Sequence, residues 1–321
     1  MTPVVTGVGA ALPGRVVPNA DFGRLGVTDE WITTRTGIRE RRRLEPDEPL
    51  GELAERAGAA ALADAGRRPS DVDHVVVATV TADLRSPGLA PGLAFRLGVP
   101  GTAALDLSAA CAGFLYALDH ACAVVESGRS SCVLVVAAEA ASRIADPGDR
   151  FTAPLFGDAA GAVVVEAAGA RCCAACAPAV VLGTDGARQE ILYIDRDTGW
   201  VRMRGAEVYE QAVIAMAGGT RKACAARGVT PADIDLFVPH QANARIIRAV
   251  LRELGFPRER TVVYVGDTGN TSSASIPVAL ERAQREGRLP AGTRVGMAAF
   301  GAGLTWGAAV LDWKGCRHAA G

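Results

Sequence analysis

Short apolar runs alternate with longer stretches in which apolar residues return every three or four positions, and this alternation continues along the chain. The two periodicities predict buried strands and amphipathic helices in turn. The predicted helices span residues 50–66, 88–98, 111–128, 207–228, 243–255 and 272–287. The predicted strands span residues 74–80, 102–108, 131–140, 158–167, 234–240, 261–266, 293–301 and 305–313. Apolar strands separated by helices predict an α/β fold with a mainly parallel sheet that is covered on both faces.

The two parts of the chain resemble each other in outline. A helix leads into "SDVDHVVVATV" (70–80) in the first part and into "ADIDLFVPHQA" (232–242) in the second. This repetition indicates an internal duplication. The length of 321 residues is also more than one compact core usually holds. We therefore expect two similar halves, 1–170 and 171–321, which share one body because no long linker separates them.

Composition and charge narrow the class of protein. Hydrophobic residues make up 49% and charged residues 21%, and the formal charge is −1, so neither a nucleic-acid partner nor a membrane surface is expected. Neither a basic segment nor a long apolar stretch follows Met1, which predicts a cytoplasmic location with reduced thiols. Cys172, Cys173 and Cys176 lack a second ligand pair, so we expect structural thiols and no metal site.

The stretch "DLSAACAGFLYAL" raises the question of chemistry. Cys111 lies where a predicted strand gives way to a predicted helix, among small residues that leave room for a substrate. The positive end of a helix stabilises a thiolate, which is the reactive form of cysteine. A packed cysteine in a tight strand–helix junction is the alternative that this stretch alone leaves open.

Of the four histidines, His240 is the best partner for Cys111. His74 starts a predicted buried strand, and His318 lies among the last residues. His120 follows Cys111 by nine positions, which turns it half a helical turn away. His240 ends a predicted strand just before a helix, the place where ligand and catalytic groups gather in parallel sheets.

Two further segments offer donors to a reacting oxygen. Asn270 lies in the turn-rich stretch "VGDTGNTSSASIP", and its amide can donate to a carbonyl oxygen, although turns also favour Asn for local reasons. The glycine-dense segment "AAFGAGLTWGAA" can bring backbone N–H groups close to that oxygen, or it can be only a tight hairpin.

In their order along the chain, these features make the sequence resemble the β-ketoacyl-acyl-carrier-protein synthase III family of the thiolase superfamily. The resemblance covers essentially the whole chain and is carried by the motifs "DEWITTRTGIRERR", "DLSAACAGF", "DPGDRFTAPLFGDAAGAVV", "PHQAN", "GNTSSASIP" and "AFGAGLTWG". It implies a five-layered αβαβα fold built from two similar halves and a homodimer. It implies no permanently bound cofactor, with acyl-CoA as a substrate and an acyl carrier protein as a partner.

The resemblance also implies a two-stage reaction. Cys111 would take the acyl group from acyl-CoA, and the backbone N–H groups of Cys111 and Gly303 would hold the oxyanion. Malonyl-carrier protein would then lose CO₂, and His240 Nε2 with the Asn270 amide would stabilise the enolate that attacks the acyl group.

Further residues match binding positions of that family. Trp31, Arg35 and Arg150 match positions around the adenine and phosphates of CoA. Arg245, Arg248 and Arg252 share one face of a predicted helix. This face suits an acidic carrier protein, although a helix face that is only exposed to solvent would show the same spacing of charges.

One departure from the family bears on the substrate. Acetyl-selective relatives have a bulky Phe in "AFPSA", where this chain reads "LRSPGLA" with Ser86. In the family this position closes the acyl pocket of the neighbouring subunit, so Ser86 predicts a primer larger than acetyl. High Ala, Gly and Arg content and a short segment before Met203 further suggest specialised fatty-acid or polyketide-type metabolism. The alternative function is an acyltransferase on the same fold that moves the Cys111-bound acyl group to an oxygen, nitrogen or carrier-protein acceptor without condensation.

Overall fold

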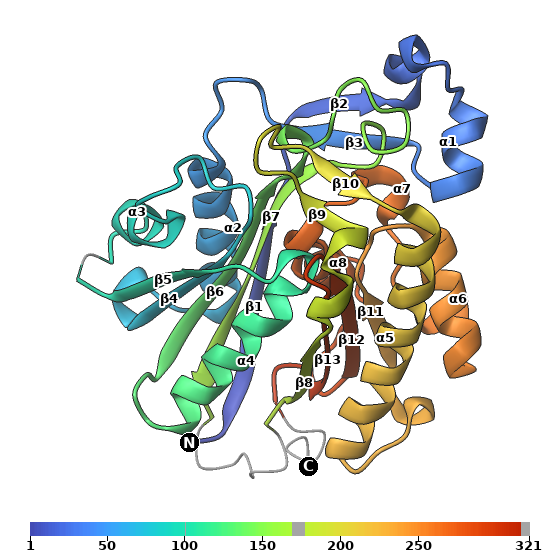
Figure 1. The fold of residues 1–321 in the computed structure, drawn as a ribbon. Helices are drawn as coiled ribbons and strands as arrows, with labels where there is room; N and C mark the ends of the chain where they lie inside the picture. The colour runs from blue at the N-terminus through green and yellow to red at the C-terminus, as the bar shows by residue number, and fades with distance from the viewer. Residues whose placement is uncertain (100, 169–176, 316–321) are drawn as a thin grey trace.

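The protein is built around two mixed β-sheets, one from each half of the chain (Figure 1). The structure is a computed structural model that describes residues 1–99, 101–168 and 177–315. The first sheet has the order β1 (Pro3–Ala11), β7 (Asp158–Ala167), β6 (Cys132–Ala140), β4 (His74–Ala78), β5 (Ala103–Leu107). The second has the order β11 (Leu236–Pro239), β12 (Arg294–Gly301), β13 (Thr305–Asp312), β8 (Ala179–Thr184).

The two sheets repeat one topology. Reading from β1 in the first sheet and from β8 in the second, the orders β1-β7-β6-β4 and β8-β13-β12-β11 correspond strand by strand. In both, the first three strands pair antiparallel and the last pair is parallel. The predicted pair of similar halves is therefore confirmed, whereas the prediction of a mainly parallel sheet is wrong. The boundary near residue 170 stays a prediction, because residues 169–176, with Cys172, Cys173 and Cys176, lie outside the described residues.

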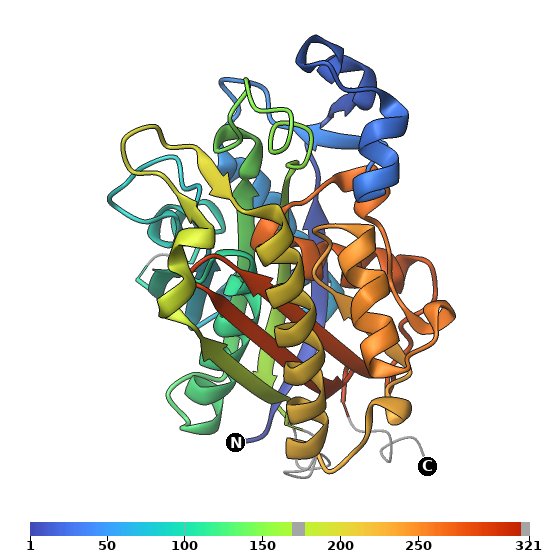
Figure 2. The same ribbon diagram turned by 45° about the vertical axis from the view of Figure 1, so that its right-hand side comes forward.

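Helices cover both outer faces and fill the space between the sheets, which gives the predicted five layers (Figures 1 and 2). The outer layer on the first sheet holds α2 (Leu50–Ala65) and α3 (Leu89–Arg96). The central layer holds α4 (Gly113–Glu126) and α8 (Ser275–Arg285), which share one apolar core with both sheets. The outer layer on the second sheet holds α5 (Gly205–Ala226) and α6 (Ala244–Leu254).

The local sequence explains this layering. Every residue of β6 is buried, and all of them except Glu139 are apolar, as expected for a strand that is covered on both faces. The helices end at glycines in the left-handed region, as at Gly66 after α2 and Gly255 after α6, because that backbone conformation favours residues without a Cβ.

Smaller elements frame one end of the sheets. These are β2 (Arg15–Pro18), α1 (Asp29–Thr36), β3 (Glu40–Arg43), β9 (Leu192–Ile194), β10 (Val201–Met203) and α7 (Val265–Thr268). The segment from β2 to β3 is anchored by Arg41, a fully buried side chain that donates to the carbonyl oxygens of Val17 and Pro154. This anchor holds α1 in place at that end of the molecule (Figure 1).

The strand predicted over 261–266 does not form. Thr261 makes only an isolated parallel bridge to Phe237, and the chain then turns into α7. The side chain of Gln241 takes the ladder positions instead: its Nε2 donates to Val262 O (3.1 Å) and its Oε1 accepts from Tyr264 N–H (2.8 Å). A side chain from a neighbouring segment thus replaces a strand, which no local pattern reveals.

Among residues 1–99, 101–168 and 177–315, no helix is both long and apolar enough to cross a membrane. In the same ranges, no three or more His, Cys, Asp or Glu side chains come together as candidate ligands of a metal ion.

The packing of α2 on β1 yields a stability prediction. A Cβ on Gly9 would lie 2.3 Å from Ala61 N and 2.4 Å from Ala57 O, so Gly9→Ala forces backbone apart and should lower the free energy of unfolding by about 1–3 kcal/mol. Denaturant unfolding measures it, with Gly14→Ala as the control because no atom lies within 4 Å of that Cβ position. Equal stability of the two variants would contradict this packing.

Candidate active site

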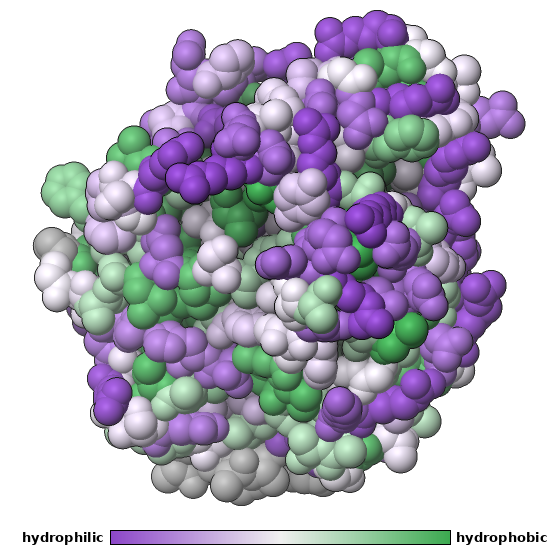
Figure 3. Space-filling model, viewed as in Figure 1, coloured by the Kyte–Doolittle hydropathy of each residue, from purple (hydrophilic) through white to green (hydrophobic). Residues whose placement is uncertain are grey.

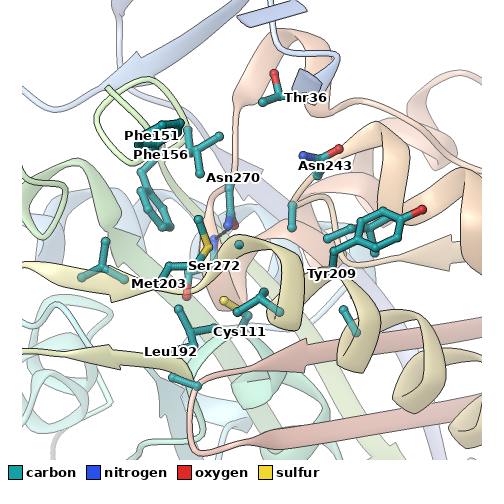
Figure 4. A pocket seen from close by; sticks show the side chains of 18 of the residues that line it. Thr36, Cys111, Phe151, Phe156, Leu192, Met203, Tyr209, Asn243, Asn270 and Ser272 are labelled. Carbon is teal, nitrogen blue, oxygen red and sulfur yellow. Dashed lines mark hydrogen bonds between the residues drawn. The ribbon is translucent and has the colours of Figure 1, made fainter. Parts of the chain in front are cut away.

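A cavity of about 790 Å³ lies where the two halves meet. Cys111, His240 and Asn270, which come from three separate segments, all line it. Figure 4 shows Cys111 and Asn270 in this cavity. The remaining lining is mostly apolar and includes Ile144, Phe156, Leu192, Val201, Met203, Val208, Met216 and Phe300. The three residues singled out in the sequence are therefore brought together by the fold.

Cys111 lies in a 3-10 turn, Ala110–Ala112, between the end of β5 and the first turn of α4. Cys111 as a residue is partly exposed, and it lines the cavity. Burial raises the pKa of the Cys111 thiol to about 11, while a hydrogen bond with the Ser272 hydroxyl lowers it. The positive end of α4 acts in the same direction as that hydrogen bond.

The glycine-rich segment at the end of β12 packs closely against Cys111. A Cβ on Gly301 would lie 2.6 Å from Cys111 N, so only glycine permits this approach. Thr305 Oγ1 also donates to Ala109 O at 2.9 Å and ties the segment to the turn that carries Cys111. Gly303 lies in the same connection between β12 and β13, and its part in an oxyanion hole stays a prediction.

His240 follows β11 and is 4% exposed. Burial lowers the pKa of its imidazole to about 4, so the ring is neutral at neutral pH. Its Nδ1 lies 2.6 Å from Ser275 Oγ, and that oxygen accepts from Gln241 N–H at 3.3 Å. The Ser275 hydroxyl hydrogen is then left for Nδ1, from which we infer that Nε2 carries the imidazole proton.

Asn270 is held in a fixed orientation by its neighbours. Its backbone N–H donates to Leu155 O (2.8 Å), and its side-chain Oδ1 accepts from Ser272 N–H (2.9 Å; Figure 4). Within the described residues no acceptor is paired with its Nδ2 amino group, so this donor remains for the cavity. A neutral imidazole and a primary amide are therefore available to stabilise a developing oxyanion.

Glu139, at the end of β6, lies fully buried behind these residues. Its carboxyl oxygens are 2.6 Å from Thr81 Oγ1, 2.8 Å from Ser273 Oγ and 3.1 Å from Ser272 Oγ, the last two on one oxygen. The sequence patterns singled out none of Glu139, Ser272 and Ser275. Serines in a turn give no motif signal that distinguishes a structural hydroxyl from one beside a nucleophile.

An aromatic and cationic cluster forms the mouth of the cavity. Trp31 and Arg35 line it, and the guanidinium carbons of Arg35 and Arg150 lie 4.4 and 5.0 Å from the Trp31 ring centroid. Phe151 adds a second ring, 6.0 Å from the Trp31 ring. The three residues predicted around CoA are thus brought together, although their role there stays a prediction.

The predicted carrier-binding arginines lie beside this mouth. Arg245 lines the cavity, and with Arg248 and Arg252 it lines a neighbouring hollow of about 560 Å³. All three side chains are exposed, and among the described residues no ion pair neutralises them. Arg258 joins the same hollow and was missed from sequence, because it lies beyond the helix.

Ser86 lies away from this cavity, in the exposed loop between β4 and α3. The protomer's own cavity is therefore lined without it, and its predicted place in a neighbour's pocket stays a prediction. His120 is also outside the cavity, where its ring packs edge-on against His74 at 5.4 Å, in agreement with the helical phase that turned it away from Cys111.

Comparison with known proteins shows similarity to one family along nearly the whole chain. The profile of the 3-oxoacyl-[acyl-carrier-protein (ACP)] synthase III family matches residues 105–186, and the C-terminal profile of the same family matches residues 224–313. β-Ketoacyl-[acyl-carrier-protein] synthase III 2 of Streptomyces coelicolor is 47% identical over 319 residues, which cover 98% of this chain and 94% of the relative.

Solved structures agree with the sequence comparisons. The 3-oxoacyl-[acyl-carrier-protein] synthase III of Aquifex aeolicus superposes with a TM-score of 0.93 at 40% identity and covers 97% of this chain and 100% of its own. The priming β-ketosynthase from the R1128 polyketide biosynthetic pathway gives 0.92 at 40% identity, over 98% of this chain and 97% of its own. Site and full-length similarity lead to one conclusion: the chain belongs to the β-ketoacyl-[acyl-carrier-protein] synthase III family of condensing enzymes.

Proposed function

We propose that this enzyme starts chain synthesis by a two-stage condensation. Cys111 takes an acyl group from acyl-CoA, and the acyl-enzyme then condenses with malonyl-carrier protein to give a β-ketoacyl thioester and CO₂. The observation that carries this proposal is the common cavity of Cys111, His240 and Asn270, in a chain similar to such synthases over nearly its whole length.

In the first stage the Cys111 thiol attacks the thioester carbon, and the CoA sulfur leaves. The negative charge that develops on the carbonyl oxygen needs preorganised donors. The backbone N–H groups of Cys111 and Gly303 fill that role in our proposal, which the close approach of Gly301 to Cys111 N supports.

In the second stage, loss of CO₂ leaves an enolate on the carrier-bound unit. His240 Nε2–H and Asn270 Nδ2–H donate to its oxygen. The lowered pKa of His240 supports this role, because a neutral ring donates a hydrogen bond without supplying an acidic proton that would quench the carbanion. The enolate carbon then attacks the acyl carbon, and Cys111 is released.

The mouth suits CoA and a carrier protein. Trp31 offers a face for stacking an adenine, while Arg35 and Arg150 offer charge for phosphates. Arg245, Arg248 and Arg252 form an exposed cationic surface next to the mouth. An acidic carrier protein docked there would direct its malonyl group into the cavity.

We further propose a homodimer that pairs through β5. This strand is the edge of the first sheet, and the nearby Leu84 and Phe95 are 61% and 78% exposed. Figure 3 shows apolar patches on the side of the molecule where β5 lies. A second copy at this edge would cover unpaired backbone and apolar surface together.

The primer in this proposal is larger than acetyl. The apolar lining beyond Cys111, which includes Leu192, Val201 and Met203, supports a longer or branched acyl chain. Ser86, carried by the loop beside β5, leaves the neighbouring protomer's pocket open. The likeness to a priming ketosynthase of a polyketide pathway favours a role in specialised metabolism.

The reaction type is tested by Asn270→Asp, which keeps the acceptor for Ser272 N–H but removes the donor to the enolate. We expect mass spectrometry of the intact protein to show acylation of this variant within about threefold of the wild-type rate, because Asn270 serves only the second stage. Condensation should fall by about 100-fold or more. Cys111→Ala should acquire no acyl mass.

Two outcomes would overturn this assignment. Asn270→Asp that condenses at the wild-type rate would remove the amide from the mechanism. Wild-type acyl-enzyme that passes its acyl group to another acceptor without releasing CO₂ would establish the acyltransferase alternative.

For the CoA mouth, we expect Trp31→Ala to raise the KM for acyl-CoA by about tenfold, since loss of one stacked base costs about 1–3 kcal/mol. The acyl thioester of N-acetylcysteamine, which has no adenine, should react as in the wild type. Steady-state acylation rates with both donors measure the difference. Equal losses with both donors would show that Trp31 shapes the site and does not bind the nucleotide.

The primer prediction is tested by Ser86→Phe. Filling the pocket should shift the ranking of acyl-CoA donors toward acetyl-CoA, while Ser86→Ala, which adds no bulk, should keep the wild-type ranking. Competition between donors of increasing chain length measures kcat/KM for each. The prediction fails if the wild type already prefers acetyl-CoA.

A further inference from the structure

Glu139 is a buried carboxyl for which the two-stage mechanism has no use. It is completely shielded from solvent, and among the described residues no cation pairs with it. Its contacts are hydroxyl groups and one backbone N–H, that of Val80 at 3.2 Å. Burying an ionised group without a counter-ion costs folding free energy. A carboxyl at this position is therefore expected to have a function.

The surroundings of Glu139 leave its proton exchangeable. Burial raises the pKa of the Glu139 carboxyl, and hydrogen bonds from Thr81, Ser273, Val80 and Ser272 only partly oppose that rise. The carboxyl therefore takes up a proton more readily than an exposed glutamate does, and its hydroxyl neighbours can act as donors or acceptors in either state.

Ser272 connects this carboxyl to the nucleophile. Its Oγ lies 3.1 Å from Glu139 Oε1. Ser272 and Cys111 line the same cavity, and hydrogen bonding by the Ser272 side chain lowers the pKa of the Cys111 thiol, against the larger rise that burial causes. The backbone of Ser272 has φ of +50° and its N–H donates to Asn270 Oδ1 at 2.9 Å, so the hydroxyl is held in place by the turn. Figure 4 places Ser272 beside Cys111, next to Asn270.

The alternative base in the cavity is poorly suited to the thiol. The His240 ring is neutral with a pKa near 4, so it holds an added proton weakly. Its Nδ1 is engaged with Ser275 Oγ at 2.6 Å, and its Nε2 carries a hydrogen in the tautomer inferred above. The thiol, whose own pKa is about 11, needs another acceptor before it can attack.

We propose that Ser272 relays the thiol proton of Cys111 to Glu139 when the enzyme is acylated. The Cys111 proton passes to Ser272 Oγ as the Ser272 hydroxyl proton passes to Glu139 Oε1. The freed sulfur electron pair forms the bond to the acyl carbon, and the C–S bond to CoA breaks. The CoA thiolate takes a proton from water at the mouth.

The second stage returns the relay to its starting state. When the enolate displaces Cys111, the sulfur leaves as a thiolate and recovers its proton from Glu139 through Ser272. The sum consumes one proton from water for each CO₂ released, as conversion of a malonyl carboxylate into CO₂ requires. This return rests on the proposed condensation, whereas the transfer from thiol to carboxyl does not.

Alkylation of Cys111 by iodoacetamide tests the relay without any acyl substrate. Peptide mapping follows Cys111 alone from mildly acidic to alkaline pH, because the alkylation rate tracks the thiolate fraction. Glu139→Gln keeps the size of the side chain but cannot accept the proton. We expect its alkylation rate at neutral pH to fall by about tenfold or more and its profile to move toward the pH of an isolated buried thiol.

A purely electrostatic role predicts the opposite sign. The negative charge of Glu139 by itself raises the pKa of Cys111, so its removal would make the thiol more acidic and alkylation faster. An unchanged or faster rate in Glu139→Gln therefore overturns the proposal. Because no CoA or malonyl group takes part, this result is independent of whether the enzyme condenses.

Adjacent serines provide a matched control. Ser272→Ala, which breaks the chain and keeps the carboxyl, should slow alkylation as Glu139→Gln does. Ser273→Ala removes a hydroxyl that lies 2.8 Å from the same Glu139 oxygen but is not part of the proposed relay. This variant should change the alkylation rate of Cys111 by less than about threefold. Equal slowing in both serine variants would reduce the network to a structural role. Cys122 and Cys224, both buried, should stay unmodified in correctly folded variants. If these cysteines become alkylated in Glu139→Gln, that variant is misfolded, and the comparison of Ser272→Ala with Ser273→Ala tests the relay instead.

Discussion

The close approach of α4 and α8 at their N-termini is the constraint on which the rest of the site depends. Both helices are packed between the two sheets, and the segments that lead into them line the same cavity, at Cys111 before α4 and at Ser272 before α8. A Cβ on Gly113 would lie 3.2 Å from Ala78 Cβ and 3.4 Å from Ser273 Cβ, so this glycine lets the first turn of α4 meet the turn before α8. Cys111 and Asn270 come within one cavity because the segments before these helices cannot separate without opening the core.

The duplicated topology explains why one such place collects so many functional groups. β4 and β11 occupy matching places in their sheets, so His240, the first residue after β11, corresponds to Thr79, the first residue after β4. The first half supplies Cys111, Glu139 and two of the hydroxyls around Glu139, those of Thr79 and Thr81. The second half supplies the imidazole, the amide and the other two hydroxyls, those of Ser272 and Ser273. Neither half contains a complete site, and burial between the sheets then sets the protonation states of the thiol, the imidazole and the carboxyl.

Sequence patterns predicted most of this frame, and their failures have physical causes. Helix and strand periodicity located α2, α4, α5, α6 and α8 and most of the strands. Among the strands of the two main sheets, the patterns missed β8 and β1. In β1, Gly7 and Gly9 interrupt the apolar run and let α2 approach. The patterns also could not distinguish parallel from antiparallel pairing, since a strand covered on both faces is apolar in either case. Cys111, His240 and Asn270 stood out because they are rare residue types at strand ends or turns, whereas Glu139, Ser272 and Ser275 gain their importance only from contacts between distant segments.

In the proposed reaction, the acyl group on Cys111 leaves by forming a carbon–carbon bond. The most direct measurement isolates the wild-type acyl-enzyme, free of acyl-CoA, and mixes it with malonyl-carrier protein labelled at the carboxyl carbon. We expect each acyl group lost from the protein mass to be matched by one labelled CO₂ and one β-ketoacyl-carrier product. Loss of the acyl group with no labelled CO₂, or labelled CO₂ with the acyl group still on Cys111 and no new product, would contradict the proposed reaction.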